Sequence, residues 1–470
     1  MTQREYDLLV IGGGTAGLVS ASGAAYLGAR VALVEKSALG GDCLWTGCVP
    51  SKAMLASAHT AAHIRKASQL GLPTLDVQPS FRRVMERTRE ARAQVALHDD
   101  PDLIRARGID VQFGAARFLA PGRVDVEGVG TLAAKRIVVA TGARPAIPPI
   151  PGLEEAGYLT HETVFDESEN PRSVLILGAG PIGLEFAQIF SRLGIPVTVV
   201  ERLPEILSGE DPEAAALLRS ILEAEGVTFQ LGEGATKVEV EGNLKTVVTS
   251  EGKRFTAETL FVATGRAPNT EGLELASAGI QCEGRAVLVT PQLGTTAKGV
   301  WAAGDVTGGP QFTHAADLMA RTVVRNALLP FSAKADLSNV PRVTYTDPEV
   351  AHVGLSHDDA RANGGVTHRY EFSNLDRAIT DGARRGFTKV TADRKGRILA
   401  ATIVAKGAGE LLMPLVLSRT HGLSLADISQ TVFPYPTMAE GVKRTADAYQ
   451  RSRLEGRAGH LLRRVVSWLL

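Results

Sequence analysis

The sequence predicts an α/β protein made of two similar βαβ units, the second inserted into the first, and a C-terminal α+β domain. Two glycine fingerprints support this prediction: residues 12–17 and residues 178–183 both read G-x-G-x-x-G between an apolar strand and a helix. A second motif, Val-Ala-Thr-Gly, recurs at residues 139–142 and 262–265. From about Asn339 onward, strand-like and helical segments alternate as in an α+β domain.

The composition is typical of a globular protein with two or three domains. The chain has 470 residues, of which 44% are hydrophobic and 22% charged, with 51 acidic and 51 basic side chains. This balance of charge does not favour nucleic acid as a partner. The polar start before residue 6 leaves no room for a signal peptide, and no apolar run is long enough to span a bilayer. We therefore expect a cytoplasmic protein.

The first βαβ unit has every part of a dinucleotide-binding turn. A strand over residues 6–11 leads into the glycines, a helix runs to Gly28, and a strand over residues 31–34 follows. The glycines allow a tight turn and let the backbone approach a pyrophosphate at the helix N-terminus. A carboxylate after the second strand can accept hydrogen bonds from a ribose. The predicted binding residues are Gly12, Gly14, Gly17 and Glu35.

The second βαβ unit repeats the first. A strand over residues 174–177 precedes its fingerprint, and a strand over residues 197–200 ends at an acidic residue at the same spacing as in the first unit. Small residues that serve only helix–strand packing would not explain two repeated features. The chain is therefore expected to bind two dinucleotides and to transfer electrons between them. The second set of binding residues is Gly178, Gly180, Gly183 and Glu201.

The second dinucleotide is expected to be NADH. A carboxylate at Glu201 accepts hydrogen bonds from a 2′-hydroxyl and repels a 2′-phosphate. Arg202 follows directly and can bind that phosphate, so NADPH is the alternative.

Two of the three cysteines, Cys43 and Cys48, lie between a glycine-rich turn and a predicted helix start. At this spacing they can form a disulfide with modest backbone rearrangement. A helix N-terminus at Cys48 favours the thiolate over the thiol. Core thiols or a zinc site are the alternatives, but zinc prefers four ligands and Cys282 stands alone far downstream. The pattern indicates a redox-active dithiol.

The segments between and after these motifs define the predicted domains. Residues 50–98 read as helical; His59 and His63 lie four positions apart there, but no third ligand is evident, and no metal site is predicted. The strand-like stretch at residues 300–305 returns to the first unit. The predicted domains are residues 1–150 with 275–338 for the first dinucleotide, 151–274 for the second, 339–450 for the α+β domain and 451–470 for a basic amphipathic tail.

Two C-terminal features have open interpretations. Two prolines flank Tyr435 and make this loop rigid. The loop either presents the phenol to an active site or only packs against neighbouring elements. The tail at residues 451–470 combines arginines with an apolar helical stripe, which indicates either a membrane-surface or partner contact, or packing on the protein's own dimer. Its residues are Arg451, Arg453, Arg457, Arg463 and Arg464, with Leu454, Ala458, Leu461, Leu462, Val465, Trp468 and Leu469.

Together, the Cys-x4-Cys-Val-Pro-Ser-Lys motif at residues 43–52, the two fingerprints, Ala-Ala-Gly-Asp at residues 302–305 and the final domain resemble the FAD-dependent pyridine nucleotide–disulfide oxidoreductases. Dihydrolipoyl dehydrogenase and mercuric reductase are members. The resemblance covers residues 5 to about 450. It implies FAD in the first unit and NAD(P)H in the second. It also implies a homodimer whose final domain completes the partner's active site.

The resemblance also implies roles for individual residues. Cys48 is the thiol that touches the flavin, and Cys43 is the thiol that exchanges with substrate. Lys52 lies near the flavin N5 and pairs with Glu185, because a buried ammonium needs a partner carboxylate and stabilises charge on the reduced flavin. Asp305 lies near the ribitol and pyrophosphate. The further cofactor-binding positions are Thr141, Gly142, Gly265, Gly304 and Thr313.

One position departs from the disulfide-reducing members, which carry a histidine oriented by a glutamate five residues later. Here Tyr435 takes the place of the histidine and Glu440 is retained. A phenol has a reference pKa near 10, far from that of a base at neutral pH. The Phe-Pro-Tyr segment is similar to mercuric reductase, although the C-terminal cysteine pair of those enzymes has no counterpart before Leu470. The Tyr435–Pro436 bond is expected to be cis.

The predicted function is an FAD-dependent NAD(P)H dithiol/disulfide oxidoreductase that acts on a lipoyl dithiol, another small disulfide or Hg(II). Two alternatives belong to other classes. One is a diaphorase that passes electrons from flavin to a quinone or oxygen. The other is a non-enzymatic FAD-binding redox sensor or membrane-recruited adaptor. The tail makes contact with the inner face of the membrane a further expectation.

Overall fold

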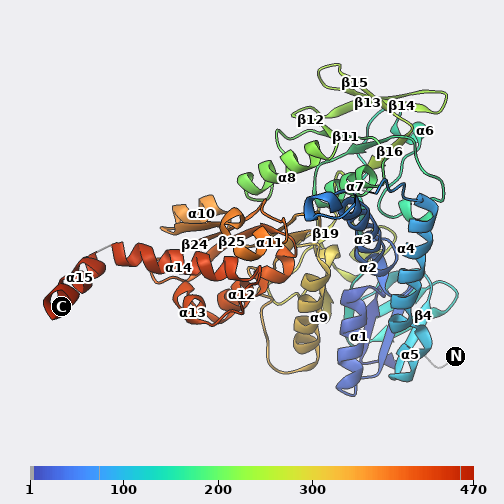
Figure 1. Cartoon of the computed structure of the whole chain (residues 1–470). Coiled ribbons are helices and arrows are strands. Elements are labelled where there is room, and N and C mark those ends of the chain that lie inside the picture. Colours follow the sequence, from blue (N-terminus) through green and yellow to red (C-terminus); the bar gives the residue numbers. More distant parts are fainter. Residues whose placement is uncertain (1–4, 74, 456) are drawn as a thin grey trace.

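The computed structural model describes residues 5–73, 75–455 and 457–470, and the side chains of residues 457, 458 and 461 lie outside this description. Figure 1 shows three adjoining regions: the first βαβ unit in blue, the second in green, and the C-terminal domain in orange to red. The observed architecture is the mixed α/β arrangement that the sequence predicts.

A five-stranded parallel sheet of order β20-β8-β2-β3-β4 forms the core of the first unit. Residues of β2 alternate between its two faces: Leu8 and Val10 pack toward α1 and α9, while Leu9 and Ile11 pack toward a second, smaller sheet. The elements are β2 (Leu8–Ile11), β3 (Val31–Glu35), β4 (Ile109–Phe113), β8 (Ile137–Val139), β20 (Val300–Ala302), α1 (Thr15–Tyr26) and α9 (Thr313–Leu328).

The smaller sheet has the order β1-β7-β6-β5 and covers the face of the main sheet opposite α1. Its strands are β1 (Glu5–Tyr6), β5 (Ala116–Ala120), β6 (Arg123–Val126) and β7 (Gly130–Ala134). The helices between β3 and β4 are α2 (Gly41–Trp45), α3 (Cys48–Arg65), α4 (Phe81–Ala96) and α5 (Pro101–Ala106), with short 3-10 turns η1 (Ala67–Leu70) and η2 (Leu97–Asp99).

The helical stretch expected over residues 50–98 is interrupted. Helix α3 ends at Arg65 and α4 begins at Phe81. Gly71, Pro73 and Pro79 lie between them, and proline removes a backbone donor that a continuous helix needs. The stretch is therefore largely helical, as expected, but it is divided into two helices that pack against each other.

The second unit has a parallel sheet of order β12-β11-β10-β16 and an antiparallel sheet of order β13-β14-β15. Proline at the first position of α7 fits a helix start, where its missing N–H costs nothing. The elements are α6 (Leu153–Ala156), η3 (Val164–Asp166), β10 (Val174–Leu177), α7 (Pro181–Arg192), β11 (Val197–Glu201), α8 (Pro212–Ala224), β12 (Val227–Leu231), β13 (Ala235–Glu241), β14 (Leu244–Thr249), β15 (Arg254–Ala257) and β16 (Thr259–Val262).

Two features connect the units. Strand β20 pairs with β8, so the chain re-enters the first sheet after completing the second. The two Val-Ala-Thr-Gly motifs are each followed by a short strand, and these strands pair antiparallel. The connecting elements are β9 (Ala143–Pro145), β17 (Arg266–Pro268), η4 (Leu275–Ala278), β18 (Cys282–Glu283), β19 (Ala286–Val287) and η5 (Asp305–Thr307). The exact domain boundaries stay a prediction.

The C-terminal domain is built on a five-stranded antiparallel sheet of order β21-β22-β25-β24-β23. Helices α12 and α14 pack on this sheet. The elements are β21 (Arg342–Thr344), β22 (Glu349–Gly354), α10 (His357–Ala362), β23 (Val366–Glu371), η6 (Phe372–Asn374), α11 (Asp376–Thr380), β24 (Phe387–Ala392), β25 (Ile398–Ala405), α12 (Ala408–His421), α13 (Leu425–Gln430) and α14 (Glu440–Glu455).

The last helix, α15 (Arg457–Leu469), projects from the end of α14 away from the rest of the chain (Figure 1). Of the predicted tail, residues 451–455 are the end of α14 and residues 457–469 form α15. Among the described residues, no helix is long and apolar enough to cross a bilayer.

Candidate active site

The two glycine turns have the same construction. Gly12 and Gly178 both have a φ of 107°, a conformation that favours glycine. A Cβ on Gly12 would overlap the carbonyl oxygen of Ala140, and one on Gly178 would overlap that of Ala263. Close backbone approach between the turn and the Val-Ala-Thr-Gly motif therefore requires glycine in both units. This explains why the two motifs recur together.

Two carboxylates stabilise these turns. Glu35 Oε2 accepts a hydrogen bond of 2.6 Å from Gly13 N, and Glu201 Oε2 accepts one of 2.7 Å from Ala179 N. Each acidic residue therefore connects the end of the second strand to the glycine turn of its own unit. These carboxylates were expected to bind ribose, and their contact with the turn was not predicted.

The first turn fits FAD. A Cβ on Gly142 would meet nothing within 4 Å, so space is open at the end of the first Val-Ala-Thr-Gly motif. The N-terminus of α1 follows the glycine turn, and its backbone N–H groups favour a pyrophosphate. Asp305 supplies a carboxylate, and Gly304, with a φ of 81°, makes the turn before it. Arg266 Nε is buried and has no hydrogen-bond partner among the described residues, which leaves a donor for a bound group.

The cysteine pair lies against this turn. Cys43 is on the short helix α2, and Cys48 is the first residue of α3. A Cβ on Gly41 would come within 2.7 Å of Gly14 Cα, so the start of α2 packs directly on the first glycine turn. Both cysteines are free thiols in this structure, and the Cys48 Sγ lies 3.6 Å from the Thr313 Oγ1 at the start of α9.

The two thiols have different acidities. A hydrogen bond from Cys43 lowers the pKa of Cys48 to about 6, and the ammonium of Lys52 contributes to this shift. The same hydrogen bond raises the pKa of Cys43, and burial adds to the increase. At neutral pH the reduced pair therefore carries a thiolate on Cys48 and a proton on Cys43. A thiolate at this position is the expected electron donor to a neighbouring acceptor.

Lys52 is held by two groups from other parts of the chain. Its Nζ donates to Glu185 Oε2 at 2.7 Å and lies 4.5 Å from the centre of the Tyr345 ring. Burial is the largest influence on the pKa of Lys52 and acts to lower it, but the charge and the hydrogen bond of Glu185, together with the charges of Cys48 and Tyr345, outweigh burial and raise the net pKa. Glu185 Oε1 also accepts a hydrogen bond of 2.9 Å from Tyr345 N. The predicted Lys52–Glu185 pair is present, whereas Tyr345 was missed.

An ion cluster lies beside Cys43. Asp42 Oδ2 is 2.7 Å from Arg266 Nη2, and the same nitrogen is 3.2 Å from Asp305 Oδ2. His161 Nε2 is 3.4 Å from Asp42 Oδ1. Burial acts to raise the pKa of Asp42, but the hydrogen bond from His161 and the charge of Arg266 hold it well below its usual range. By contrast, burial raises the pKa of Asp305, although Arg266 opposes this shift.

This cluster was not predicted from the sequence. Asp42, His161 and Glu162 bring their ligand atoms within 4.8 Å of one another, as a metal site requires. However, the Arg266 guanidinium contacts both Asp42 and His161, the latter at 3.0 Å, and it is therefore the cation that this group holds. The only available signal was the position of Arg266 directly after the second Val-Ala-Thr-Gly motif.

The pair His59 and His63 also meets a third group. Asp347 Oδ2 lies 3.9 Å from His63 Nε2, but Arg192 Nη1 is nearer to the same oxygen, at 3.0 Å. Burial, reinforced by the charge of Arg192, lowers the pKa of His59 to about 4. The carboxylate is therefore paired with an arginine.

Tyr435 and Glu440 lie apart from this centre within one chain. Tyr435 is 67% exposed, and its hydroxyl donates to Asp376 Oδ2 at 3.0 Å, which raises the pKa of the phenol. Glu440 is buried, and its Oε2 has no hydrogen-bond partner in the described part of the chain. None of the hydrogen bonds found for these two residues reaches Cys43 or Cys48. The Tyr435–Pro436 bond is cis, as predicted.

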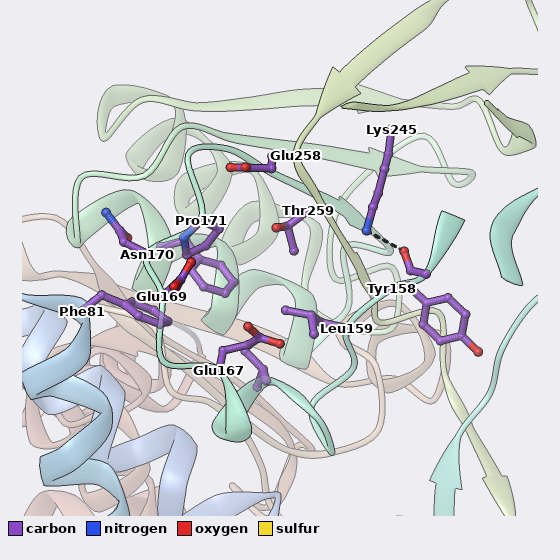
Figure 2. Close-up of a pocket in the computed structure, with 13 residues that line it drawn as sticks. Phe81, Tyr158, Leu159, Glu167, Glu169, Asn170, Pro171, Lys245, Glu258 and Thr259 are labelled. Atoms are coloured by element: carbon purple, nitrogen blue, oxygen red, sulfur yellow. Dashed lines mark hydrogen bonds between the residues drawn. The ribbon is translucent and has the colours of Figure 1, made fainter. Parts of the chain in front are cut away.

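A cavity of about 370 Å³ lies elsewhere in the second unit, between Phe81 and the start of β16 (Figure 2). Lys245 Nζ donates to Gly157 O in its wall at 2.9 Å, and burial lowers the pKa of this lysine. Thr259 and Val174 are paired at the amino ends of their parallel strands. A dinucleotide binds at the carboxyl ends, next to Gly178, so this cavity is separate from the nicotinamide site.

A fold with two dinucleotide turns, and a dithiol packed on the first of them, defines a flavoprotein that transfers electrons from a nicotinamide to a disulfide. The comparisons with known proteins agree. Residues 6–320 match the family described as pyridine nucleotide-disulphide oxidoreductase, and residues 340–446 match the dimerisation domain of that family. The chain therefore belongs to the pyridine nucleotide-disulphide oxidoreductases.

Individual relatives cover nearly the whole chain. A mercuric reductase of Lysinibacillus sphaericus is 35% identical over 96% of this chain and 84% of its own length. A dihydrolipoyl dehydrogenase of Bacillus subtilis is 33% identical over 94% and 97%. Among solved structures, the flavoprotein disulfide reductase RclA of Escherichia coli, in complex with Cu(II), has a TM-score of 0.86 at 29% identity, over 95% of this chain and 99% of that chain.

These findings confirm the predicted fold, the enzyme class and the cofactors. The protein is an FAD-dependent NAD(P)H disulfide oxidoreductase of the dihydrolipoyl dehydrogenase and mercuric reductase type. The comparisons do not favour a diaphorase or a non-enzymatic sensor. The presence of a dimerisation domain also agrees with the homodimer expected for this family. The roles of individual residues and the substrate stay predictions.

Proposed function

We propose that this oxidoreductase reduces a soft metal ion such as Hg(II) at the Cys43–Cys48 dithiol, with NADH as electron donor. The proposal rests on Tyr435, a phenol at the position where disulfide-reducing members place a basic histidine. Its hydrogen bond to Asp376 raises the pKa of the phenol, so it stays protonated at neutral pH and cannot take a proton from an exchanging thiol. A metal ion that thiolates bind directly needs no such base.

The residues have separate tasks in this proposal. FAD, when bound, supplies the two-electron link between the nicotinamide and the cysteine pair. Lys52, fixed by Glu185, places a positive charge beside the flavin site. Cys48 faces the flavin as the thiolate, and Cys43 meets the substrate. One NADH then reduces one Hg(II) to Hg(0), with NAD⁺ and a proton as the other products.

The relatives support the choice of a metal ion. Mercuric reductases are among the most similar curated proteins, and one structural neighbour was solved with Cu(II). A lipoyl disulfide is the competing substrate, because dihydrolipoyl dehydrogenases are similar to nearly the same extent. Glu440 is the observation in favour of the disulfide, since this carboxylate is retained and buried with one unpaired oxygen.

The test compares two acceptors in NADH oxidation by the purified yellow protein: Hg(II) buffered with excess small thiol, and lipoamide. We expect turnover on Hg(II) that is lost in Cys43→Ser, and little turnover on lipoamide. Tyr435→His should increase lipoamide turnover, since a histidine restores a base beside Glu440; Tyr435→Phe serves as its matched control. Cys43-dependent turnover of the wild type on lipoamide alone would overturn the metal-ion proposal.

Tyr435 is further proposed to act on the cysteines of the partner subunit. Its exposure and the matched dimerisation domain support this arrangement. If Cys43→Ser and Tyr435→Ala each inactivate the homodimer, co-expression of the two chains should restore turnover, because one site of each heterodimer is then intact. Absence of rescue in purified heterodimers would place Tyr435 with the cysteines of its own chain.

The proposed location is the cytoplasm. Contact with the inner face of the membrane through residues 451–470 is an extension of this proposal and depends on α15. Fractionation of cells into soluble and membrane pools, for the full chain and for a chain ending at Glu455, tests the location directly.

A further inference from the structure

Helix α15 exposes an unusual amount of apolar surface for the end of a chain. Trp468 is 84% exposed and Leu469 is 69% exposed, while Leu462, Val465 and Val466 are each about half exposed. Figure 1 shows the helix extending away from the body of the protein beyond α14. Isolated exposed leucines are common, but a continuous row of them on a projecting helix indicates a surface that contacts something else.

The apolar side chains lie on one face of α15. Leu462, Val465, Val466 and Leu469 follow the i, i+3, i+4, i+7 spacing of a helical stripe. At about 100° per residue, the side chains on the opposite face are polar or basic. These are His460, Arg463, Arg464 and Ser467.

The charge of this segment has one sign. Residues 457–470 contain no Asp or Glu, so the arginines have no acidic partner within the helix. Arg463 Nη2 lies 3.3 Å from His460 Nδ1, which carries no negative charge. A basic face beside an apolar stripe matches a surface that is negatively charged above and apolar below, as an anionic lipid bilayer is.

We infer that α15 binds the surface of an anionic lipid bilayer, lying in the interface with its apolar face inserted. At about 1.5 Å per residue, its 13 residues span about 20 Å, too short to cross the hydrocarbon core. Trp468 lies at the border of the apolar stripe, where an indole favours the lipid headgroup level. The surface is independent of the identity of the reduced substrate.

Within one chain, α15 lies apart from the active site. It continues from the end of α14, in the C-terminal domain, whereas the glycine turns before α1 and α7 and the cysteine helices α2 and α3 lie in the other two regions (Figure 1). Membrane contact would therefore leave the dinucleotide turns of the same chain uncovered. For this reason NADH oxidation in solution is a control for folding in every variant below.

The experiment measures co-sedimentation of the FAD-loaded protein with vesicles. Full-length protein and a chain ending at Glu455 are compared on phosphatidylcholine vesicles with and without 30% phosphatidylglycerol. We expect the full chain to pellet with the anionic vesicles, and the shortened chain to stay in solution with unchanged NADH oxidation. Equal pelleting of the two chains would overturn the inference.

Two pairs of substitutions in α15 distinguish the contribution of its positive charge to vesicle binding from that of apolar insertion. Arg463→Gln with Arg464→Gln should weaken binding roughly 25-fold, at about fivefold for each arginine near the surface. Arg82→Gln with Arg83→Gln, two adjacent exposed arginines on α4, is the matched control and should change little. Trp468→Ser with Leu469→Ser should also reduce binding. Binding that depends on the arginines alone would show adsorption without insertion and would overturn the inference.

A second copy of the chain is the competing occupant of this face. Analytical ultracentrifugation without lipid distinguishes it, because a contact between copies would lower the oligomeric state when α15 is removed. We expect the same oligomer with and without α15. An oligomer that dissociates on truncation, without vesicle binding by the full chain, would assign the apolar face to protein contact instead.

Discussion

Asp42 and Arg266 form an ion pair of 2.7 Å that joins the redox helix to the end of the second dinucleotide unit. Asp42 directly precedes Cys43 on α2, and Arg266 directly follows Gly265 at the start of β17. The same guanidinium contacts Asp305, so one cation compensates two carboxylates that come from different segments. The position of Cys43 therefore depends on a residue more than two hundred positions away.

Arg266→Met should destabilise the protein strongly. It leaves Asp42 and Asp305 without their cation, and removing one partner of a largely buried pair costs about 3–5 kcal/mol, reduced here to about 2–4 kcal/mol by partial exposure. The free energy of unfolding in urea measures the loss. Arg321→Met, which removes an exposed i,i+4 pair with Asp317, is the control and should cost less than about 0.5 kcal/mol. Equal losses in the two variants would contradict the role of the cluster.

Reduced Cys48 should titrate far below an ordinary thiol. Its pKa is lowered to about 6, so the thiolate is present above this pH and is lost as the pH falls through it. Thiolate absorbance at 240 nm, measured on reduced protein with Cys48→Ser as background, should rise with a midpoint near pH 6. Cys43→Ala removes the donating thiol and should move the midpoint upward. A midpoint near pH 9 in the wild type would rule out the hydrogen bond.

Glu185→Gln removes the negative charge beside Lys52. Glutamine has one acceptor oxygen, so it can keep the hydrogen bond from Lys52 or the one from Tyr345 N but not both, and without the charge of Glu185 the pKa of Lys52 should fall. Reduction of the flavin by NADH should then slow by roughly tenfold or more, since a fixed positive charge stabilises developing negative charge. Stopped-flow absorbance measures this rate, and Glu223→Gln on the exposed face of α8 should leave it unchanged.

The nicotinamide preference should depend on Glu201. Glu201→Ala removes the carboxylate that is predicted to accept from a ribose, so the KM for NADH should rise about tenfold while the KM for NADPH falls or stays constant. Steady-state kinetics with both nucleotides measures the change. Because Glu201 also accepts from Ala179 N, thermal unfolding of the variant shows whether the turn itself has weakened. A wild type that prefers NADPH would contradict the assignment.

Local patterns made most of the fold predictable. The glycine turns, their carboxylates and the Cys-x4-Cys motif can each be recognised in a short stretch of sequence. The repeated Val-Ala-Thr-Gly motif is a second sign that the βαβ unit occurs twice. The Lys52–Glu185 pair came from the family resemblance, since nothing local connects two residues on separate helices. The interruption between α3 and α4 was not predicted, because the overall helical pattern of residues 50–98 was given more weight than the two helix-breaking prolines, Pro73 and Pro79.

The unpredicted part of the site consists of contacts between distant segments. Arg266, His161 and Tyr345 each lie far in sequence from the residues that they contact near the cysteines. No spacing rule predicts which arginine meets which carboxylate once the two units pack together. The environment of Tyr435 was also unpredictable, because its hydrogen-bond partner Asp376 belongs to another helix.

The exposure of Tyr435 has an evolutionary consequence. Substitutions at exposed positions usually change the unfolding free energy by less than about 0.5 kcal/mol. By contrast, Lys52 and Arg266 are held in paired, largely buried groups where exchange is costly. Under the role proposed for Tyr435, descendants of this chain would acquire new acceptors by changing one loop while keeping the ion pairs around the cysteines. Selection for a new substrate should then produce variation at Tyr435 before it reaches Lys52 and Arg266.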